Sequence, residues 1–291
     1  MKISVSTYSF SPLMKKGEMT QLDCVKKAKE FGSDAIEFVD ILPHDGSSLE
    51  EYAVRLKEAA EKNELTISNY TFGADFLTGS GGDVEAEIER VKKQIDLAVI
   101  LGAKSVRHDA TSGFSSGGRG YKGFDDALPQ LADACRRVTI YAEAKGVRTM
   151  VENHGYFCQD SDRVEKLINT VAHPNFGWLV DMGNFLCADD NPVTAVGRAA
   201  PYAFYAHAKD FYVKSGNGAN PGEGFFHSRG GKYLRGAIIG HGDVPVVQCL
   251  RALRLAGYDG DIAIEFEGME HSLDGVRIGL ANLRKYIEMV K

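Results

Sequence analysis

The chain lacks the cysteine patterns of disulfide frameworks and thiolate metal sites. It has five cysteines in 291 residues, and they are scattered, odd in number and without Cys-x-x-Cys spacing. Such usage is typical of a reduced, intracellular protein. The N-terminal stretch MKISVSTYSF has no long apolar run, so the sequence predicts neither a signal peptide nor a transmembrane helix. The expected compartment is the cytoplasm.

Basic charge and phosphate-binding motifs are also missing. The formal net charge is −6, which argues against nucleic acid or a membrane surface as partner. The glycine-rich segment 214–243 contains neither G-x-G-x-x-G nor G-x-x-x-x-G-K-S/T, so no nucleotide cradle is indicated. The expected partner is a small molecule. The sequence leaves open whether the chain forms a homo-oligomer or joins a partner subunit.

Short β-branched or aromatic runs alternate with longer amphipathic segments along the whole chain. The expected strands are 3–10, 35–40, 66–73, 105–110, 148–155, 176–184, 203–213 and 261–268. The expected helices are 21–31, 49–63, 84–101, 125–145, 161–171, 192–200, 244–256 and 273–290. Eight such pairs without a linker predict an α/β fold, a single (β/α)₈ TIM barrel over residues 1–291. Segment 214–243, after the seventh strand, is predicted to be an active-site lid loop, with a hairpin of its own.

Ionisable side chains recur at the ends of the last four expected strands. Glu152, Asp181 and His207 follow one another at intervals of about one barrel unit, and Glu265 follows after one unit plus the glycine-rich segment. Each alone is more often structural, because a strand-end Asp commonly caps a helix. As a set they need a common explanation, since buried charges are costly unless paired or bound to a metal. Their hard donor atoms favour Mn²⁺, Mg²⁺ or Co²⁺ over a thiolate-rich zinc site.

Other polar residues near the same barrel end are candidate substrate contacts. Lys209 could hold a substrate oxygen or pair with a carboxylate. The remaining candidates are Glu37, Arg107, His227 and Arg229.

Four segments in order carry a family resemblance: VENHG, LVDMGNF, AHAKD and GYDGDIAIEFE. They resemble the xylose isomerase-like TIM-barrel superfamily, and within it the sugar phosphate isomerase/epimerase group with its ketose 3-epimerases, inosose dehydratases and hydroxypyruvate isomerases. The resemblance implies a divalent ion, usually Mn²⁺, with Mg²⁺, Co²⁺ or Zn²⁺ as alternatives, held by Glu152, Asp181, His207 and Glu265. It also implies that Glu152 and Glu265 are the catalytic acid/base pair.

The chain departs from the ketose 3-epimerase pattern at three positions. Asn184 stands where those enzymes carry a histidine, Cys158 stands where they carry a second glutamate, and His154 is not part of the pattern. The expected activity is isomerisation or epimerisation of a small sugar or keto-sugar, by proton abstraction next to a carbonyl with the metal stabilising the enediolate. The alternative is a lyase or dehydratase acting on a 3-keto-glycoside or inosose, with His154 as the catalytic base.

Two other classes are disfavoured. A DNA-repair endonuclease of this superfamily needs a three-zinc site with more ligands and a basic groove, whereas this chain has eight histidines and a negative net charge. A non-catalytic sugar-binding module would have no need of all four predicted ligands.

Overall fold

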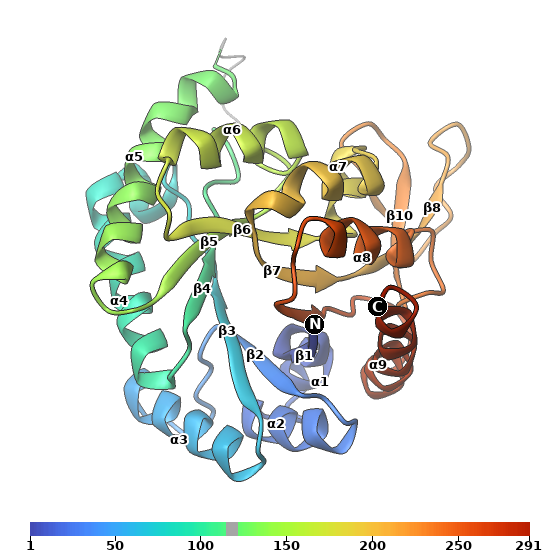
Figure 1. Ribbon diagram of the computed structural model, residues 1–291, viewed down its shortest axis with the longest axis horizontal. Coiled ribbons are helices and arrows are strands. Elements are labelled where there is room, and N and C mark those ends of the chain that lie inside the picture. The colour runs from blue at the N-terminus through green and yellow to red at the C-terminus, as the bar shows by residue number, and fades with distance from the viewer. Residues whose placement is uncertain (115–121) are drawn as a thin grey trace.

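Eight parallel strands close into a barrel. A computed structural model describes residues 1–114 and 122–291, and its barrel strands follow the order β1-β11-β7-β6-β5-β4-β3-β2 (Figure 1). Their bounds are Lys2–Ser6 (β1), Ala35–Val39 (β2), Thr66–Phe72 (β3), Ser105–His108 (β4), Arg148–Glu152 (β5), Phe176–Asp181 (β6), Ala203–Ala208 (β7) and Asp261–Ile264 (β11). The predicted (β/α)₈ fold is confirmed.

The helices form a ring outside the strands (Figure 1). The α-helices are Ser11–Lys15 (α1), Gln21–Glu30 (α2), Leu49–Lys62 (α3), Val84–Leu101 (α4), Phe124–Glu143 (α5), Ser161–Val171 (α6), Pro192–Ala199 (α7), Val246–Leu255 (α8) and Ser272–Glu288 (α9). Short 3₁₀ turns are Thr7–Phe10 (η1), Gly79–Gly82 (η2), Asn184–Ala188 (η3) and Ala200–Tyr202 (η4). Each predicted helix is present, with its ends shifted by at most a few residues.

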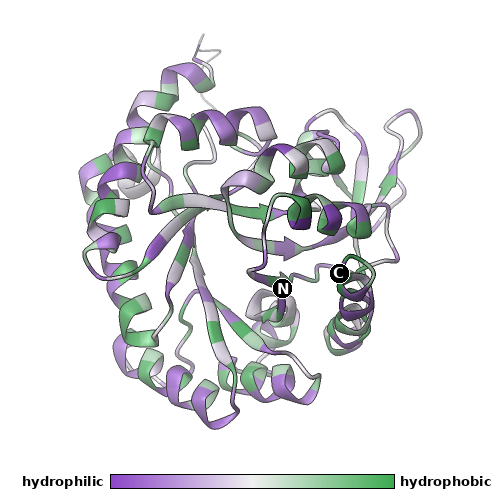
Figure 2. Cartoon of the chain, in the orientation of Figure 1, coloured by the Kyte–Doolittle hydropathy of each residue, from purple (hydrophilic) through white to green (hydrophobic). Residues whose placement is uncertain are grey.

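Helix α4 illustrates why these segments fold as they do. The Asp83 side chain accepts hydrogen bonds from the first-turn N–H groups of Glu85 and Ala86, and Gly102 ends the helix in the left-handed region at φ 85°. Apolar residues along one face are buried against the barrel, and the helices show alternating apolar and polar colour in Figure 2. No helix in the described part of the chain has both the length and the apolar character needed to cross a membrane.

A small apolar layer fills the barrel interior beneath the candidate site. It consists of Met150, Leu179, Tyr205 and Ala263, each at most 2% exposed. Because strand side chains alternate between two faces, the residue two positions further along points the same way. The residues two positions beyond this layer are the four predicted metal ligands: Glu152, Asp181, His207 and Glu265. The core packing of the barrel therefore sets the height and direction of the ligand side chains.

The segment after β7 is more ordered than the sequence indicates. The strand predicted over 203–213 breaks at Lys209, and β8 (Asp210–Lys214) pairs with β10 (Tyr233–Ala237), which pairs with β9 (Phe226–His227). These three antiparallel strands are called the small sheet below. The Asp210 carboxylate accepts N–H hydrogen bonds from Phe211, Gly240, Gly242 and Val244. One buried side chain thus fixes both ends of the excursion, and the hairpin predicted within it is present.

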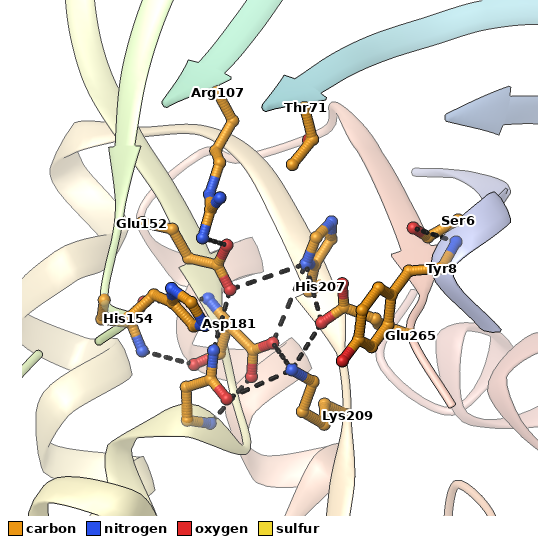
Figure 3. A network of polar contacts seen from close by, with 12 residues as sticks. Ser6, Tyr8, Thr71, Arg107, Glu152, His154, Asp181, His207, Lys209 and Glu265 are labelled. Atoms are coloured by element: carbon orange, nitrogen blue, oxygen red, sulfur yellow. Dashed lines mark hydrogen bonds and ion pairs between the residues drawn. The ribbon is translucent and has the colours of Figure 1, made fainter. Parts of the chain in front are cut away.

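The first strand is shorter than predicted. β1 ends at Ser6, and the chain turns into η1 and α1. The Ser9 hydroxyl donates to the Ile264 carbonyl and accepts from the Phe266 N–H, so the turn is bonded to the last barrel strand. This turn brings Tyr8 to the edge of the candidate site (Figure 3).

Candidate metal centre

The four predicted ligands meet at one end of the barrel. Glu152 and Asp181 end β5 and β6, His207 lies in β7 opposite Asp181, and Glu265 directly follows β11. One possible ligand atom from each lies within 4.8 Å of all the others, and all four residues are buried (Figure 3). The structure therefore brings together the residues that the sequence selected.

Two buried atoms without a hydrogen bond test whether a cation fits. His207 Nε2 lies 2.8 Å from a Glu37 carboxylate oxygen, so its Nδ1 faces Glu152, Asp181 and Glu265 at 3.6 to 3.8 Å. His207 Nδ1 and Asp181 Oδ2 are buried without a hydrogen bond. A buried polar atom left unpaired costs about 1–3 kcal/mol. A divalent ion between these atoms would satisfy both, so the donor set fits a metal.

The electrostatics of the four-residue cluster point the same way. Burial raises the pKa of Asp181 to about 6, with further contributions from the neighbouring carboxylates and an opposing one from Lys209. Burial disfavours charge on His207, but Glu37 and Glu265 hold its pKa well above the ordinary value. Burial opposes charge on Glu152 and Glu265 as well, but Arg107 and Lys209 lower the pKa of these two carboxyls below the usual value. Asp181 is therefore the carboxyl of the cluster that retains a proton most readily, and a cation at the centre would favour its ionised form.

Glu37 contacts the His207 ring nitrogen that faces away from the other three predicted ligands. Its other oxygen accepts hydrogen bonds from Asn69 Nδ2 at 2.9 Å and from the Thr71 hydroxyl at 2.8 Å. Such a carboxylate on the far nitrogen of a histidine fixes the ring and its tautomer for metal binding. The contact of Glu37 with substrate stays a prediction.

Two asparagines that the sequence reading left without a role hold the ligands. Asn153 donates to the Asp181 carbonyl and accepts from the Asp181 N–H and from Trp178 Nε1, which joins β5 to β6. Asn184 donates to Glu152 Oε1 at 2.8 Å and accepts from Lys209 Nζ at 3.2 Å. Asn184, which stands where ketose 3-epimerases carry a histidine, therefore links the Glu152 carboxylate to the Lys209 ammonium group.

Lys209 is a buried cation in contact with the cluster. Its Nζ lies 2.5 Å from Glu265 Oε2 and 3.4 Å from both Asp181 Oδ2 and Glu267 Oε1. Burial opposes its charge, but the surrounding carboxylates raise the pKa of Lys209 well above its usual value. Lys209 therefore pairs with a carboxylate, that of Glu265, which is one of its two predicted roles. Its contact with substrate stays a prediction.

A second network flanks Glu152 on the opposite side. Arg107 Nη2 lies 2.6 Å from Glu152 Oε2 and 2.9 Å from Asp109 Oδ1, and that Asp109 oxygen lies 2.9 Å from His154 Nδ1. The His154 side chain keeps 49% exposure. Partial desolvation of the half-exposed ring lowers the pKa of His154, but the Asp109 carboxylate more than offsets this and raises it. Arg107 thus fixes the orientation of Glu152, and His154 lies further out, beyond Asp109.

His227 and Arg229 do not join the four-residue cluster. The Arg229 guanidinium contacts the Asp160 carboxylate at 2.8 Å and the Tyr156 carbonyl, and the Tyr156 hydroxyl donates to the His227 carbonyl at 2.9 Å. These bonds tie the small sheet to the segment between β5 and α6. Their predicted contact with substrate has no test in this structure and stays a prediction.

Cys158 and Tyr8 complete the surroundings of the site. Burial raises the pKa of the Cys158 thiol to about 12, so near neutral pH it carries no charge and does not replace the second glutamate of the epimerase pattern. Tyr8 was missed because the sequence pattern continues the first strand through it. The Glu267 carboxylate, followed by burial, raises the pKa of Tyr8 to about 12. The tyrosine is therefore a neutral hydroxyl beside the cluster.

A family profile described as xylose isomerase-like TIM barrel matches residues 25–286. The chain belongs to this family. A comparison with curated proteins finds no match.

Solved structures of similar fold cover nearly the whole chain. The IolI protein with a zinc atom is 16% identical at a TM-score of 0.74, covering 100% of this chain and 99% of that one. A probable 3-DHS dehydratase, AsbF from Bacillus anthracis, is 19% identical at 0.73, covering 98% and 99%. An L-ribulose 3-epimerase is 16% identical at 0.72, covering 99% and 95%. Similarity at these identities establishes the shared barrel.

Proposed function

We propose that the protein is a cytoplasmic, divalent-metal-dependent isomerase or epimerase of a small sugar or keto-sugar, with Mn²⁺ as its ion. The observation that carries the proposal is the group of four buried ligand atoms within 4.8 Å of one another, two of them without a hydrogen bond. The likeness in fold to an L-ribulose 3-epimerase and to a zinc-containing protein agrees with it.

The side chains around the centre suit proton transfer next to a carbonyl. The bound ion would supply Lewis-acid chemistry, making such a proton easier to remove. Glu152 and Glu265, drawn on either side of His207 in Figure 3, would remove the proton and return it. Arg107 and Lys209 hold these two carboxylates at 2.6 Å and 2.5 Å and keep them ionised. Both cations would also offer N–H donors to substrate oxygens.

A lyase or dehydratase acting on a 3-keto-glycoside or inosose is the second candidate. The contact that favours it is the 2.9 Å pair between His154 Nδ1 and Asp109. A carboxylate that orients an imidazole is the arrangement of a general base. Because Nδ1 is engaged, Nε2 would meet the substrate.

The proposed reaction is tested by isotope exchange. Metal-loaded protein incubated in D₂O with a panel of ketoses and keto-sugars is expected to incorporate deuterium at the carbon next to the carbonyl of at least one member. Chelator-treated protein should lose the exchange, and re-addition of Mn²⁺ should restore it. Mass spectrometry then distinguishes an isomer of unchanged mass from an elimination product. A fully metallated protein that exchanges none of the panel would contradict the proposal.

Segment 214–243, predicted to be a lid, is expected to close over bound substrate, because closure excludes water that competes with the substrate. Chymotrypsin should cut at Phe225, Phe226 or Tyr233 in the free protein and less once a substrate identified by exchange is added. Arg229→Ala removes an exposed ion pair worth about 0.2–1 kcal/mol and should speed cutting by at most roughly fivefold.

The control for that variant is Arg254→Ala, which removes an arginine of similar exposure and its pair with Asp259 at 2.6 Å, beside the N-terminus of the chain. Arg254→Ala should leave cutting in the small sheet unchanged. Equal cutting with and without substrate would count against a lid.

A further inference from the structure

A cavity of about 420 Å³ lies beside the metal centre. Its lining comes from three parts of the chain: the turn after β1, the segment after β11, and the excursion that contains the small sheet. The volume is within the roughly 300–1,000 Å³ range of small-molecule sites. None of the four ligand residues lines it, so it is a space additional to the centre itself.

The cavity and the centre share a polar border. Glu267 lines the cavity, and its Oε1 lies 3.4 Å from Lys209 Nζ, which in turn contacts Glu265 Oε2 at 2.5 Å. Tyr8, another lining residue, lies next to Glu265 in Figure 3. A single layer of side chains, which includes Lys209 and Glu267, therefore separates a molecule bound at the centre from the cavity.

Aromatic rings from three segments give the cavity its chemical character. Tyr8 follows β1, Phe266 follows β11, and Phe226 belongs to β9 of the small sheet. Ser11, Lys15 and Ser272 add hydroxyl and ammonium groups. A lining of aromatic side chains with a few polar groups suits a flat or puckered ring that carries hydroxyls.

The wall between the small sheet and the end of the barrel is close-packed backbone. Gly236 in β10 forms a parallel bridge with Gly268, and a Cβ at Gly236 would lie 2.2 Å from the Glu267 carbonyl oxygen. Only glycine fits there without displacing that backbone. β10 is therefore packed against the barrel end at Gly236, beside the cavity.

We propose that this cavity binds a second ring attached to the reacting sugar, so that the natural substrate is a glycoside or a disaccharide-like compound. The inference rests on the proposed function only in placing the reacting sugar at the metal centre. The second ring stacks on Tyr8 and Phe226, and its hydroxyls meet Glu267 and the nearby serines. The excursion after β7 thereby selects substrates by their substituent.

The experiment measures dissociation constants by calorimetry on Mg²⁺-loaded protein. The probes are matched sets in the glucose, galactose and xylose series: the methyl β-glycoside, the phenyl β-glycoside, and cellobiose, lactose or xylobiose. In at least one series a ring-bearing member is expected to bind about tenfold more tightly than the methyl glycoside, as stacking on aromatic faces predicts. Comparing the phenyl glycosides with the disaccharides shows whether the cavity prefers an aromatic ring or a second sugar ring.

Two variants test the assignment to this cavity. Tyr8→Ala and Phe226→Leu should each remove most of that advantage, and Tyr8→Phe, which keeps the ring, should retain it. Leu42→Ala, in a neighbouring cavity of about 310 Å³ that Glu267 does not line, is the matched control and should change nothing. Melting curves establish that the variants fold.

Equal affinities within every series, an advantage that survives both variants, or no binding by any probe would overturn the proposal. Binding needs no turnover, so the outcome is separate from that of the proposed reaction. If the protein prefers ring-bearing probes but exchanges no deuterium, the assignment of the cavity is supported and the proposed isomerase activity is contradicted.

Discussion

Replacing Glu152 by Gln and Asp181 by Asn together is expected to lower bound metal from about one equivalent per chain to almost none, because two of the hard oxygen donors that such ions require lose their charge. Both substitutions keep side-chain volume, so the packing of Met150 and Leu179 beneath them should persist. Elemental analysis of protein purified without chelator measures the change. If the double variant still bound about one metal ion per chain, the assignment of Glu152 and Asp181 as metal ligands would be wrong.

The same variant should also lose stabilisation by metal. An ion that binds only the folded state at about 100 times its dissociation constant adds about 2.7 kcal/mol to the free energy of unfolding. Denaturant unfolding of the wild type with and without Mn²⁺ should show this increase, and the double variant should show none. Asp133→Asn with Glu288→Gln neutralises two exposed carboxylates elsewhere and should keep the full increase.

The clustering of Glu152, Asp181, His207 and Glu265 was predictable because barrel geometry converts sequence position into spatial position. Parallel strands in register end at one height, and the period of two along each strand sets which side chains point inward. Glu152, Asp181, His207 and Glu265 each lie two residues beyond a residue of the interior apolar layer. A pattern of strand ends in one sequence therefore carries the information that locates the centre.

The residues that hold the ligands were not predictable in the same way. Asn153 and Asn184 can each donate and accept in many directions, and only the closed barrel decides that they meet Asp181 and Glu152. Tyr8 was missed for a different reason. ISVSTYSF alternates as a strand throughout, but Ser9 bonds to Ile264 and Phe266 at the other end of the chain and turns it early. Long-range hydrogen bonds overrode the local pattern.

Neutralising Glu265 is expected to abolish most deuterium exchange, whereas removing the His154 imidazole is expected to leave most of it. In the proposed reaction Glu152 and Glu265 remove and return the proton, and loss of a positioned acid or base costs about 10²–10⁴ in rate. His154 then only shapes the pocket, so His154→Ala should weaken substrate binding. Exchange is measured for Glu265→Gln and His154→Ala at a metal concentration that restores occupancy, verified by elemental analysis.

The same pair of variants identifies the lyase if it is the true activity. The Asp109 carboxylate at 2.9 Å would then serve to orient the His154 ring. His154→Ala would lose on the order of 10²–10⁴ in exchange rate with metal retained, and Asp109→Asn would lose part of it. Glu288→Gln, on the exposed end of α9, should leave both exchange and metal unchanged. Loss of exchange in metallated His154→Ala would make His154 the base and move the conclusion from isomerase to lyase, because the ligand carboxylates alone would not then remove the proton.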